Sequence, residues 1–514
     1  MTVASNAANA PRVGVAVVGA GAMGSGIAQV AATAGHRVLL YDARAGAAEH
    51  AVDGIRSTLR RVVDKGRLEP EAFEQIMSRL GAASALEDLG GCELVVEAIV
   101  EDLKVKQELF GKLEAMVGDG AILATNTSSI SVTAIGTGLK RPERLVGMHF
   151  FNPAPLMPLV EVVSGVATAA AVAEQIYALS LAWGKKPVHA RSTPGFIVNR
   201  VARPYYAEGL RLLQEGAAGC ATIDAVMREA GGFRMGPFEL MDMIGHDVNY
   251  AVTRSVFDAF YGDPRFQPSL LQLDLVQAGF FGRKSGRGFY DYREGAPTQV
   301  ADHEPDAAVP SGAIVWTGSP TGSALAKRLD EHAVAFERMA GEGPANAIAA
   351  VGDAFLFVTD GRTASALAGD VQLPNCVVVD LMLAPESATR VAIAKADQCA
   401  DGAYEKLLGL LQGAGLTVSR LSDTPGLAVM RIVAMLANEA NDAVHQQVCS
   451  AQDVDIAMRA GVAYPKGPLE WAQSIGPQRV LAVLDHLFEF YREPRYRASP
   501  RLRQSRFKAA AEPA

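Results

Sequence analysis

The sequence predicts an α/β protein in which a nucleotide-binding sheet domain and an all-helical domain occur once intact and once in degenerate form. Three observations support this prediction. A glycine-rich turn, Gly19–Gly24, lies between a β-branched run and a helical pattern. Amphipathic helical patterns then fill the chain from about residue 193 to residue 292. Finally, Thr193-Pro-Gly recurs as Thr424-Pro-Gly, 231 positions later, together with neighbouring identities.

The N-terminal segment has the element order of a Rossmann-like dinucleotide-binding domain, which we expect to span residues 11–191. Val13–Val18 is typical of a buried parallel strand. The glycine-rich turn follows at once, then a helical pattern over Ser25–Ala34 and a second strand over Val38–Tyr41. A glycine motif alone is weak evidence, but this complete order within about 30 residues is specific for dinucleotide binding.

Each part of this motif has a physical role. Gly19 permits the tight turn, Gly21 lets the backbone approach a pyrophosphate, and Gly24 lets the helix pack on the sheet. The free N–H groups at the start of the helix favour an anion. Asp42 ends the second strand and would accept hydrogen bonds from ribose hydroxyls. A carboxylate there repels a 2′-phosphate, so NAD is favoured over NADP, although the nearby Arg44 weakens this inference.

The composition excludes several other classes of protein. The formal charge of −8 gives no general attraction for nucleic acid or anionic lipid. Five cysteines without CxxC spacing predict neither a disulfide framework nor a metal site, and suit the reducing cytoplasm. Met1–Arg12 lacks an apolar signal core. Val13–Gly35 carries no charge, but its six glycines make it a poor membrane span, so no membrane association is expected.

Polar residues follow the later strands of this domain. We expect a strand over Glu93–Val100, a helix over Glu101–Leu113 and a strand over Ala121–Thr125. Ligands collect at the carboxyl ends of strands in such sheets, which places Glu101 and Ser128 beside a nicotinamide. For each residue alone, a capping or solvated role is an equally good interpretation.

A histidine and a glutamate form the candidate catalytic pair. His149 ends an expected strand over Leu145–His149, and a strand over Leu159–Val163 brings Glu161 within reach. A histidine beside the cofactor can take a proton from an alcohol, and a carboxylate behind it would fix its tautomer. Taken alone, His149 is more often a structural histidine, so the functional interpretation depends on its context.

Four separated motifs together resemble the NAD-dependent 3-hydroxyacyl-CoA dehydrogenases. They are Gly19–Gly24, Asn126–Ser129, His149–Pro153 and Thr193–Arg200, and with Gly282–Tyr290 the resemblance runs from about Val13 to Tyr292. It implies an acyl-CoA substrate, with His149 as the general base, Glu161 as its orienting partner, and Ser128 and Asn199 holding substrate oxygens. For the cofactor surroundings it implies Gly19, Gly21, Met23, Gly24, Asp42, Glu101, Lys106 and Asn152, and for coenzyme A it implies Thr58 and Lys65.

Helical patterns over Val201–Gln214, Thr222–Ala230 and Pro237–Asp258 form the predicted helical domain. The expected domain order after the first sheet domain is a helical domain (192–292), a polar linker (293–313), a degenerate α/β segment (314–420) and a second helical domain (421–507). The degenerate segment has neither the glycine motif nor a match to the histidine motif, and Asn199 is replaced by Met430. Shorter members of the family pair through their helical domains. We therefore expect the second helical domain to pack on the first and to replace or extend the contact of a homodimer.

The substrate is the least determined property. Ser164–Ala170, Ser180–Lys185 and Val201–Tyr206 are most similar to the long enzymes of phenylacetate catabolism, which act on 3-hydroxyadipyl-CoA. Arg203 or another basic residue would then meet the distal carboxylate. Pro158 stands where the family commonly has lysine, which leaves the substrate preference open. The alternatives are a short-chain 3-hydroxybutyryl-CoA dehydrogenase and, remotely, a non-catalytic NAD-binding structural protein.

Overall fold

The computed structural model describes residues 14–509 and forms two compact units. One unit comprises residues 14–200 and 446–463, and the other comprises 201–445 and 464–509. Met1–Arg12, Val13 of the first expected strand and residues 11–13 of the expected first domain lie outside the described residues. Within residues 14–509, no helix combines the length and apolar composition needed to cross a membrane.

The first unit contains a twisted eight-stranded sheet within its described residues, in the order β3-β2-β1-β4-β5-β6-β7-β8. Its strands are β1 (Gly14–Val18), β2 (Arg37–Tyr41), β3 (Leu80–Ala82), β4 (Leu94–Glu97), β5 (Ile122–Thr125), β6 (Leu145–Phe150), β7 (Leu159–Ser164) and β8 (Lys186–Arg191). All neighbouring strands run parallel except β6 and β7, which are antiparallel. The strands are apolar and mostly buried, as expected for a parallel sheet covered on both faces.

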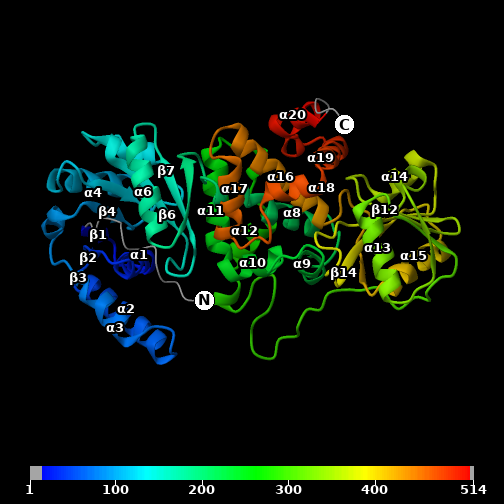
Figure 1. Ribbon diagram of the computed structural model, residues 1–514, viewed down its shortest axis with the longest axis horizontal. Coiled ribbons are helices and arrows are strands. Elements are labelled where there is room, and N and C mark those ends of the chain that lie inside the picture. Colours follow the sequence, from blue (N-terminus) through cyan, green and yellow to red (C-terminus); the bar gives the residue numbers. More distant parts are fainter. Residues whose placement is uncertain (1–13, 510–514) are drawn as a thin grey trace. The chain divides into compact units, whose positions relative to one another are not determined.

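Helices cover this sheet, and Figure 1 shows α1, α4 and α6 beside it. The helices of the unit's first part are α1 (Ala22–Thr33), α2 (Ala47–Asp64), α3 (Pro70–Ser78), α4 (Leu103–Met116), α5 (Val132–Gly136), α6 (Ala170–Ala182) and α7 (Val198–Val201). The charge-free stretch of the sequence is divided between β1 and α1. Its small residues pack α1 closely on the sheet, with Ile27, Ala28 and Ala31 fully buried. The expected Rossmann-like fold is confirmed.

The helical part of the second unit begins with a long helix that the sequence predicts almost correctly. Its helices are α8 (Arg203–Gln214), α9 (Cys220–Glu229), α10 (Pro237–Ile244), α11 (His246–Ala259) and α12 (Leu270–Gln277). The single helix expected over Pro237–Asp258 is wrong, because the chain breaks at Gly245. That glycine has φ +98°, a conformation that ends a helix and that only glycine adopts without strain.

The second sheet has seven strands within the described residues, in the order β10-β9-β11-β12-β13-β14-β15. Its strands are β9 (Ala313–Trp316), β10 (Phe336–Met339), β11 (Ala349–Val351), β12 (Ala354–Val358), β13 (Cys376–Val379), β14 (Arg390–Lys395) and β15 (Thr417–Arg420). Three helices flank it: α13 (Pro320–Glu331), α14 (Ala364–Val371) and α15 (Asp401–Gly413). The expected degenerate α/β segment is therefore a complete, smaller sheet domain.

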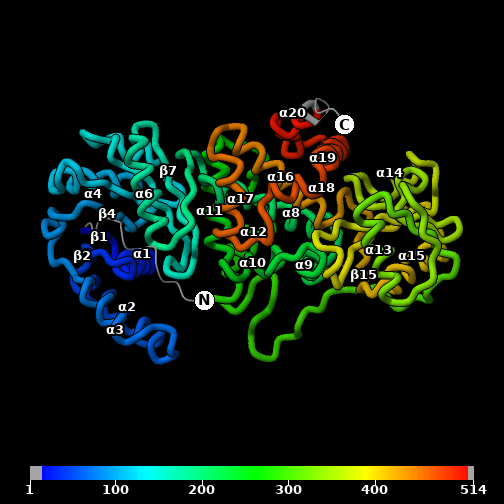
Figure 2. Tube along the Cα trace, viewed as in Figure 1, coloured from blue at the N-terminus to red at the C-terminus, as the bar shows by residue number. Residues whose placement is uncertain are grey.

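The segment expected as a linker contains no helix and no strand over residues 293–312, and Figure 2 traces it as a long green connection. It is nevertheless held against the second sheet domain. The N–H of Glu304 donates to the carbonyl of Val418 at 2.8 Å, and the N–H of Ala307 donates to Gln412 Oε1 at 2.7 Å. The linker is thus ordered by backbone hydrogen bonds that its polar composition does not predict.

The second helical repeat packs against the first through a buried helix. The repeat contains α16 (Val429–His445), α17 (Ala451–Gly461), α18 (Pro468–Ile475), α19 (Pro477–Tyr491) and α20 (Pro500–Ala509). Helix α16 contacts α8, and nearly all of its residues are buried. Arg431 on α16 is fully buried and donates to Glu208 on α8 at 2.8 Å. The packing of one helical repeat on the other is therefore present within a single chain.

Two helices at corresponding places in the repeats each pack on the sheet domain of the other half of the chain. Helix α17, from the second repeat, belongs to the first unit and contacts β7 and β8 there. Within this contact, a Cβ on Gly461 would lie 2.6 Å from Leu159 Cδ2. Helix α9, from the first repeat, contacts β14 of the second sheet, where Glu229 pairs with Arg390 at 3.1 Å. The repeats have thus exchanged equivalent helices.

Candidate active site

The glycine-rich turn between β1 and α1 has the shape of a pyrophosphate cradle. Gly19 has φ +105°, and a Cβ there would lie 2.4 Å from the Ala98 carbonyl oxygen. A Cβ on Gly24 would lie 1.8 Å from the Gly19 carbonyl oxygen, so only glycine lets the helix approach the turn. By contrast, no atom of the described part of the chain lies within 4 Å of a Cβ built on Gly21, which is exposed. Within residues 14–509, no side chain caps the N-terminus of α1, so its N–H groups are available to an anion.

Asp42 lies at the end of β2, beside this turn. Its Oδ2 accepts a hydrogen bond from the N–H of Ala20 at 2.8 Å, which ties the carboxylate to the glycine-rich turn. The Arg44 side chain donates to the same carboxylate at 3.1 Å and holds its pKa down at about 2. Asp42 is therefore an anion at any physiological pH. The residues present fit a dinucleotide with an unmodified ribose.

A buried network of charged residues lies at the carboxyl ends of β4 and β5. The Lys106 ammonium is 1% exposed and contacts Glu97 Oε1 at 2.6 Å and Glu101 Oε2 at 3.2 Å. Glu101 Oε1 accepts hydrogen bonds from the N–H of Ser128 at 2.9 Å and from Ser129. Burial opposes the ionisation of Glu101, but Lys106 and these hydrogen bonds hold its pKa below the ordinary value. Glu101 is thus an anion that fixes the loop after β5.

His149 and Glu161 form a buried pair on adjacent strands. The two residues lie directly opposite each other in the antiparallel register of β6 and β7. His149 Nδ1 lies 2.6 Å from Glu161 Oε2, and their side chains are 6% and 0% exposed. A carboxylate at this distance places the ring proton on Nδ1. The Nε2 lone pair of His149 is then the basic atom of the pair.

The second oxygen of Glu161 holds the start of the next helix. Oε1 accepts hydrogen bonds from the N–H groups of Ile197 and Val198, at 3.0 and 2.9 Å. Asn199 follows directly on α7 and is partly exposed. One buried carboxylate therefore orients His149 and also fixes the segment that carries Asn199.

The other predicted site residues are spread over several elements of the first unit. Met23 and Ser128 are partly exposed, on α1 and in the loop after β5, and Asn152 is exposed after β6. Thr58 is exposed on α2, and Lys65 is exposed at the C-terminal end of the same helix. Lys106 is buried and contacts Glu101, whose side chain is partly exposed. Pro158 precedes β7, and its carbonyl accepts the N–H of Lys186 at 2.7 Å.

Two residues of this site are absent from the sequence-based prediction. Glu97 ends β4 fully buried and accepts hydrogen bonds from Lys106 and Thr125. The strand expected over Glu93–Val100 therefore ends three residues early, because the chain turns to bury this carboxylate. Asn126 Oδ1 accepts the N–H of Phe150 at 2.8 Å, beside His149. The sequence did contain an indication of the buried Glu97, because this residue is the one charge within the apolar run Leu94–Val100.

The second half of the chain shows the same framework without the histidine–glutamate pair. At the 231-residue offset, Asp380 replaces His149 and Ala392 replaces Glu161, and the N–H of Asp380 donates to the Ala392 carbonyl. Asp380 Oδ2 accepts hydrogen bonds from the N–H groups of Ala428 and Val429, at 2.9 and 2.7 Å. These N–H groups match those that Glu161 holds. One buried carboxylate, whose pKa burial raises to about 6, keeps the helix in place without a base.

The second nucleotide loop is also changed. Ser319 stands at the helix N-cap position that Gly21 holds in the first domain, and its Oγ accepts the N–H of Gly322 at 3.1 Å. That N–H is therefore capped by the protein itself. Gly322 keeps the packing role of Gly24, since its Cβ would lie 2.0 Å from the Trp316 carbonyl oxygen. The second domain therefore retains the glycine that packs the helix on the sheet, as Gly322. It has Ser319 in place of Gly21, the glycine whose missing side chain leaves open space at the turn.

Comparison with known proteins gives consistent matches along the chain. The family model described as "3-hydroxyacyl-CoA dehydrogenase, NAD binding domain" matches residues 14–193. The model described as "3-hydroxyacyl-CoA dehydrogenase, C-terminal domain" matches twice, at residues 195–292 and 426–509. The model described as "3-hydroxybutyryl-CoA dehydrogenase reduced Rossmann-fold domain" matches residues 356–425. The internal helical repeat is confirmed by the double match.

Individual relatives agree with these matches. The chain is 47% identical over 490 residues to a 3-hydroxyadipyl-CoA dehydrogenase of Escherichia coli strain K12, covering 95% of this chain and 96% of that protein. It is 42% identical to the mitochondrial hydroxyacyl-coenzyme A dehydrogenase of Sus scrofa, covering 54% of this chain and 91% of that protein. A crystal structure titled 3-hydroxybutyryl-CoA dehydrogenase from Escherichia coli K12 superposes with a TM-score of 0.89 at 44% identity. That match covers 98% of this chain and 100% of the other.

Proposed function

Because the chain belongs to the 3-hydroxyacyl-CoA dehydrogenase family, we propose that it oxidises the 3-hydroxyl group of 3-hydroxyadipyl-CoA, with NAD as cofactor. The observation that carries the reaction class is the buried His149–Glu161 pair, which leaves one basic ring nitrogen at the end of a strand of the dinucleotide-binding sheet. The substrate is supported by the 47% identity to the 3-hydroxyadipyl-CoA dehydrogenase across both halves of the chain.

In the proposed mechanism, His149 Nε2 accepts the proton of the substrate hydroxyl. Glu161 stabilises the imidazolium that forms, because it already accepts the Nδ1 proton at 2.6 Å. Bound NAD supplies the acceptor for the hydride that leaves C3 of the substrate. Ser128 and Asn199 hold substrate oxygens, and Glu101 keeps the Ser128 loop in place. The product is the 3-ketoacyl-CoA.

The remaining assignments are part of the same proposal. Gly19, Gly21, Gly24 and Asp42 bind NAD at the N-terminus of α1, with Met23, Glu101 and Asn152 beside them and Lys106 acting through Glu101. Thr58 and Lys65 contact coenzyme A, as the exposure of both side chains allows. We propose a cytoplasmic location, supported by five free cysteines. The contact of α16 with α8 takes the place of pairing between two helical domains.

The substrate proposal is tested by comparing kcat/KM for 3-hydroxyadipyl-CoA and 3-hydroxybutyryl-CoA, following NADH absorbance. We expect kcat/KM to be at least tenfold higher for the adipyl substrate. This ratio corresponds to the binding free energy of about one hydrogen bond between charged groups. The crystal structure titled 3-hydroxybutyryl-CoA dehydrogenase makes the short-chain substrate the second candidate. Equal or higher efficiency with 3-hydroxybutyryl-CoA would favour that candidate. The absence of NADH formation from either thioester would contradict the dehydrogenase assignment.

Replacing Asp42 with alanine is expected to lower kcat/KM for NAD by about 10- to 100-fold, because a charged hydrogen-bond acceptor for the ribose is lost. The loss of its negative charge also removes the repulsion of a 2′-phosphate, so activity with NADP should rise and Arg44 becomes free to bind it. Steady-state kinetics with both cofactors measure the change. Asp53→Ala on exposed α2 is the matched control and should leave both values unchanged. An unchanged NAD-to-NADP ratio in Asp42→Ala would exclude Asp42 from the cofactor site.

A further inference from the structure

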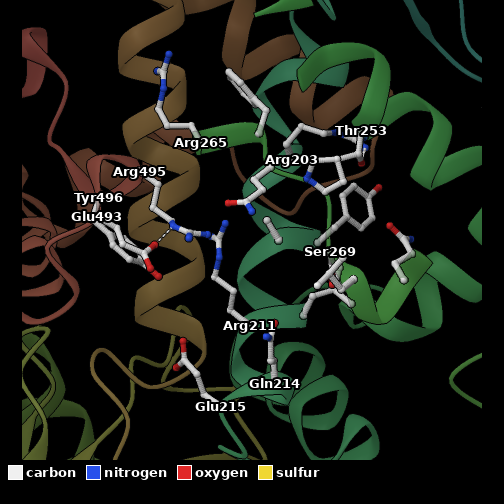
Figure 3. A pocket seen from close by; sticks show the side chains of 18 of the residues that line it. Arg203, Arg211, Gln214, Glu215, Thr253, Arg265, Ser269, Glu493, Arg495 and Tyr496 are labelled. Carbon is white, nitrogen blue, oxygen red and sulfur yellow. Dashed lines mark hydrogen bonds and ion pairs between the residues drawn. The ribbon is translucent and has the colours of Figure 1, made fainter. Parts of the chain in front are cut away.

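A cavity of about 410 Å³ lies within the second unit, and none of the residues that line it is among those assigned to catalysis. Its walls come from α8, from residues 265–272 at the start of α12, from Thr253 on α11, and from residues 491–496 after α19. Figure 3 shows four arginines around it, labelled Arg203, Arg211, Arg265 and Arg495. The volume suits a small organic molecule rather than a single ion.

Most charges on the cavity wall are already neutralised by the protein. The ion pairs of its wall residues are Arg211 with Glu208, Arg265 with Asp263 and Asp442, Arg495 with Glu493, and Glu215 with Arg431. These pairs account for three of the four arginines and for both glutamates of the wall. The remaining charged residue of the wall is Arg203.

Arg203 is a buried cation without a carboxylate partner among the described residues. Its side chain is 5% exposed, and Nη1 donates to Thr253 Oγ1 at 3.0 Å. The guanidinium lies over the Tyr206 ring, 4.8 Å from its centre, and Nε has no hydrogen-bond partner within residues 14–509. Burial lowers the pKa of this guanidinium, because no nearby anion compensates for the lost water. Buried charges in proteins are normally paired with an opposite charge. Arg203 has no such carboxylate within residues 14–509.

A second polar atom of the same wall is also unsatisfied. Ser269 Oγ is buried without a hydrogen-bond partner in the described part of the chain, although the residue stands at the N-cap position of α12, where serine usually caps the helix. The second helical repeat has Ala434 at the offset position of Arg203, so the arginine is not required to build the repeat. Arg203, which has no carboxylate partner within residues 14–509, and Ser269, whose hydroxyl has no hydrogen-bond partner there, thus line the same cavity. An organic carboxylate has the chemistry to pair with both.

We propose that this cavity binds an organic carboxylate that pairs with Arg203 and accepts a hydrogen bond from Ser269. An arginine fork matches the two oxygens of a carboxylate, and the low exposure strengthens the pair. Two sources carry this chemistry: a free dicarboxylic acid, and the distal carboxylate of a dicarboxylyl-CoA. The second source rests on the function proposed above, whereas the first is independent of it.

The first experiment measures binding of free adipate to the full-length protein by calorimetry. Wild type should bind adipate and not adipamide, which has the same shape without charge. Arg203→Met should weaken adipate binding by about 10- to 100-fold, the loss expected for a charged hydrogen bond. Arg211→Met is the matched control, since it removes a wall arginine that Glu208 already neutralises. Arg203→Lys and Ser269→Ala give intermediate losses and decide the matter if Arg203→Met does not fold.

The second experiment compares kcat/KM for 3-hydroxyadipyl-CoA and 3-hydroxyhexanoyl-CoA, which differ by carboxylate against methyl at the chain end. If the carboxylate comes from the substrate, Arg203→Met reduces the ratio of the two values by about 10- to 100-fold, and Arg211→Met does not. If it is a free acid, adipate binding is lost while the ratio stays unchanged. The proposal is overturned if Arg203→Met and Arg211→Met behave alike in both experiments. A wild type that oxidises no 3-hydroxyacyl-CoA would refute the proposed function. The adipate titration of wild type and variants would then be the test of carboxylate binding in the cavity.

Discussion

Replacing His149 with glutamine is expected to lower kcat by about 10²–10⁴-fold, the usual contribution of a positioned general base. Glutamine keeps the size of the side chain and a hydrogen bond to Glu161, but it cannot accept the hydroxyl proton. Affinity for NAD should remain close to wild type, because His149 is no part of the turn that holds Gly19, Gly21 and Gly24. Steady-state kinetics measure the first effect, and NADH fluorescence titration measures the second.

Glu161→Gln provides a companion variant with a specific mechanism. An amide NH₂ facing His149 would force the ring proton from Nδ1 onto Nε2, which removes the basic atom. We therefore expect a loss in kcat of the same order as in His149→Gln, and no further loss when the two changes are combined, because the residues act as one unit. Wild-type kcat in His149→Gln would remove this histidine from the mechanism. A multiplicative loss in the double variant would show that the two residues act separately.

Replacing Arg431 with methionine is expected to destabilise the second unit by about 3–5 kcal/mol, as for other buried ion pairs that lose one partner. Arg431 is fully buried on α16. It donates to Glu208 at 2.8 Å, to Glu215 at 2.9 and 3.0 Å, and to the Tyr496 hydroxyl at 2.8 Å. Without Arg431, the fully buried Glu208 carboxylate loses one of its two arginine partners among the described residues and keeps Arg211.

Thermal unfolding followed by circular dichroism measures this effect, and a decrease in Tm on the order of 10 °C is expected. Arg492→Met is the matched control, since Arg492 is 71% exposed and pairs with the exposed Glu489. Exposed pairs contribute about 0–1 kcal/mol, so the control should change Tm little. A Tm of Arg431→Met equal to that of the control would show that this ion pair does not hold α16 against α8.

The pattern of local motifs explains why much of the site could be predicted. Gly19, Gly21 and Gly24 act within one turn, so their spacing alone specifies the loop. His149 and Glu161 are twelve positions apart on strands whose alternation fixes the register, which the structure shows as direct neighbours. The helical repeat was visible because its second copy kept Thr193-Pro-Gly as Thr424-Pro-Gly, together with identities inside the helices such as Glu208 and Glu439.

The Rossmann-like domain, its nucleotide loop, the His149–Glu161 pair and the duplication could all be predicted before the structure, because each depends on short-range spacing or on direct repetition. Four features became visible only in the folded chain: the helix break at Gly245, the burial of Glu97, the exchange of α9 and α17 between halves, and the hydrogen bonds by which Asp380 holds the start of α16. The folded chain also shows that Arg203, alone among the arginines of its cavity wall, has no carboxylate partner within the described residues. The buried charges could not be paired in advance because spacing along the sequence does not record which charged groups meet in the folded chain. The break at Gly245 and the exchange of α9 and α17 depend on backbone conformation and on packing, which a helical pattern does not specify.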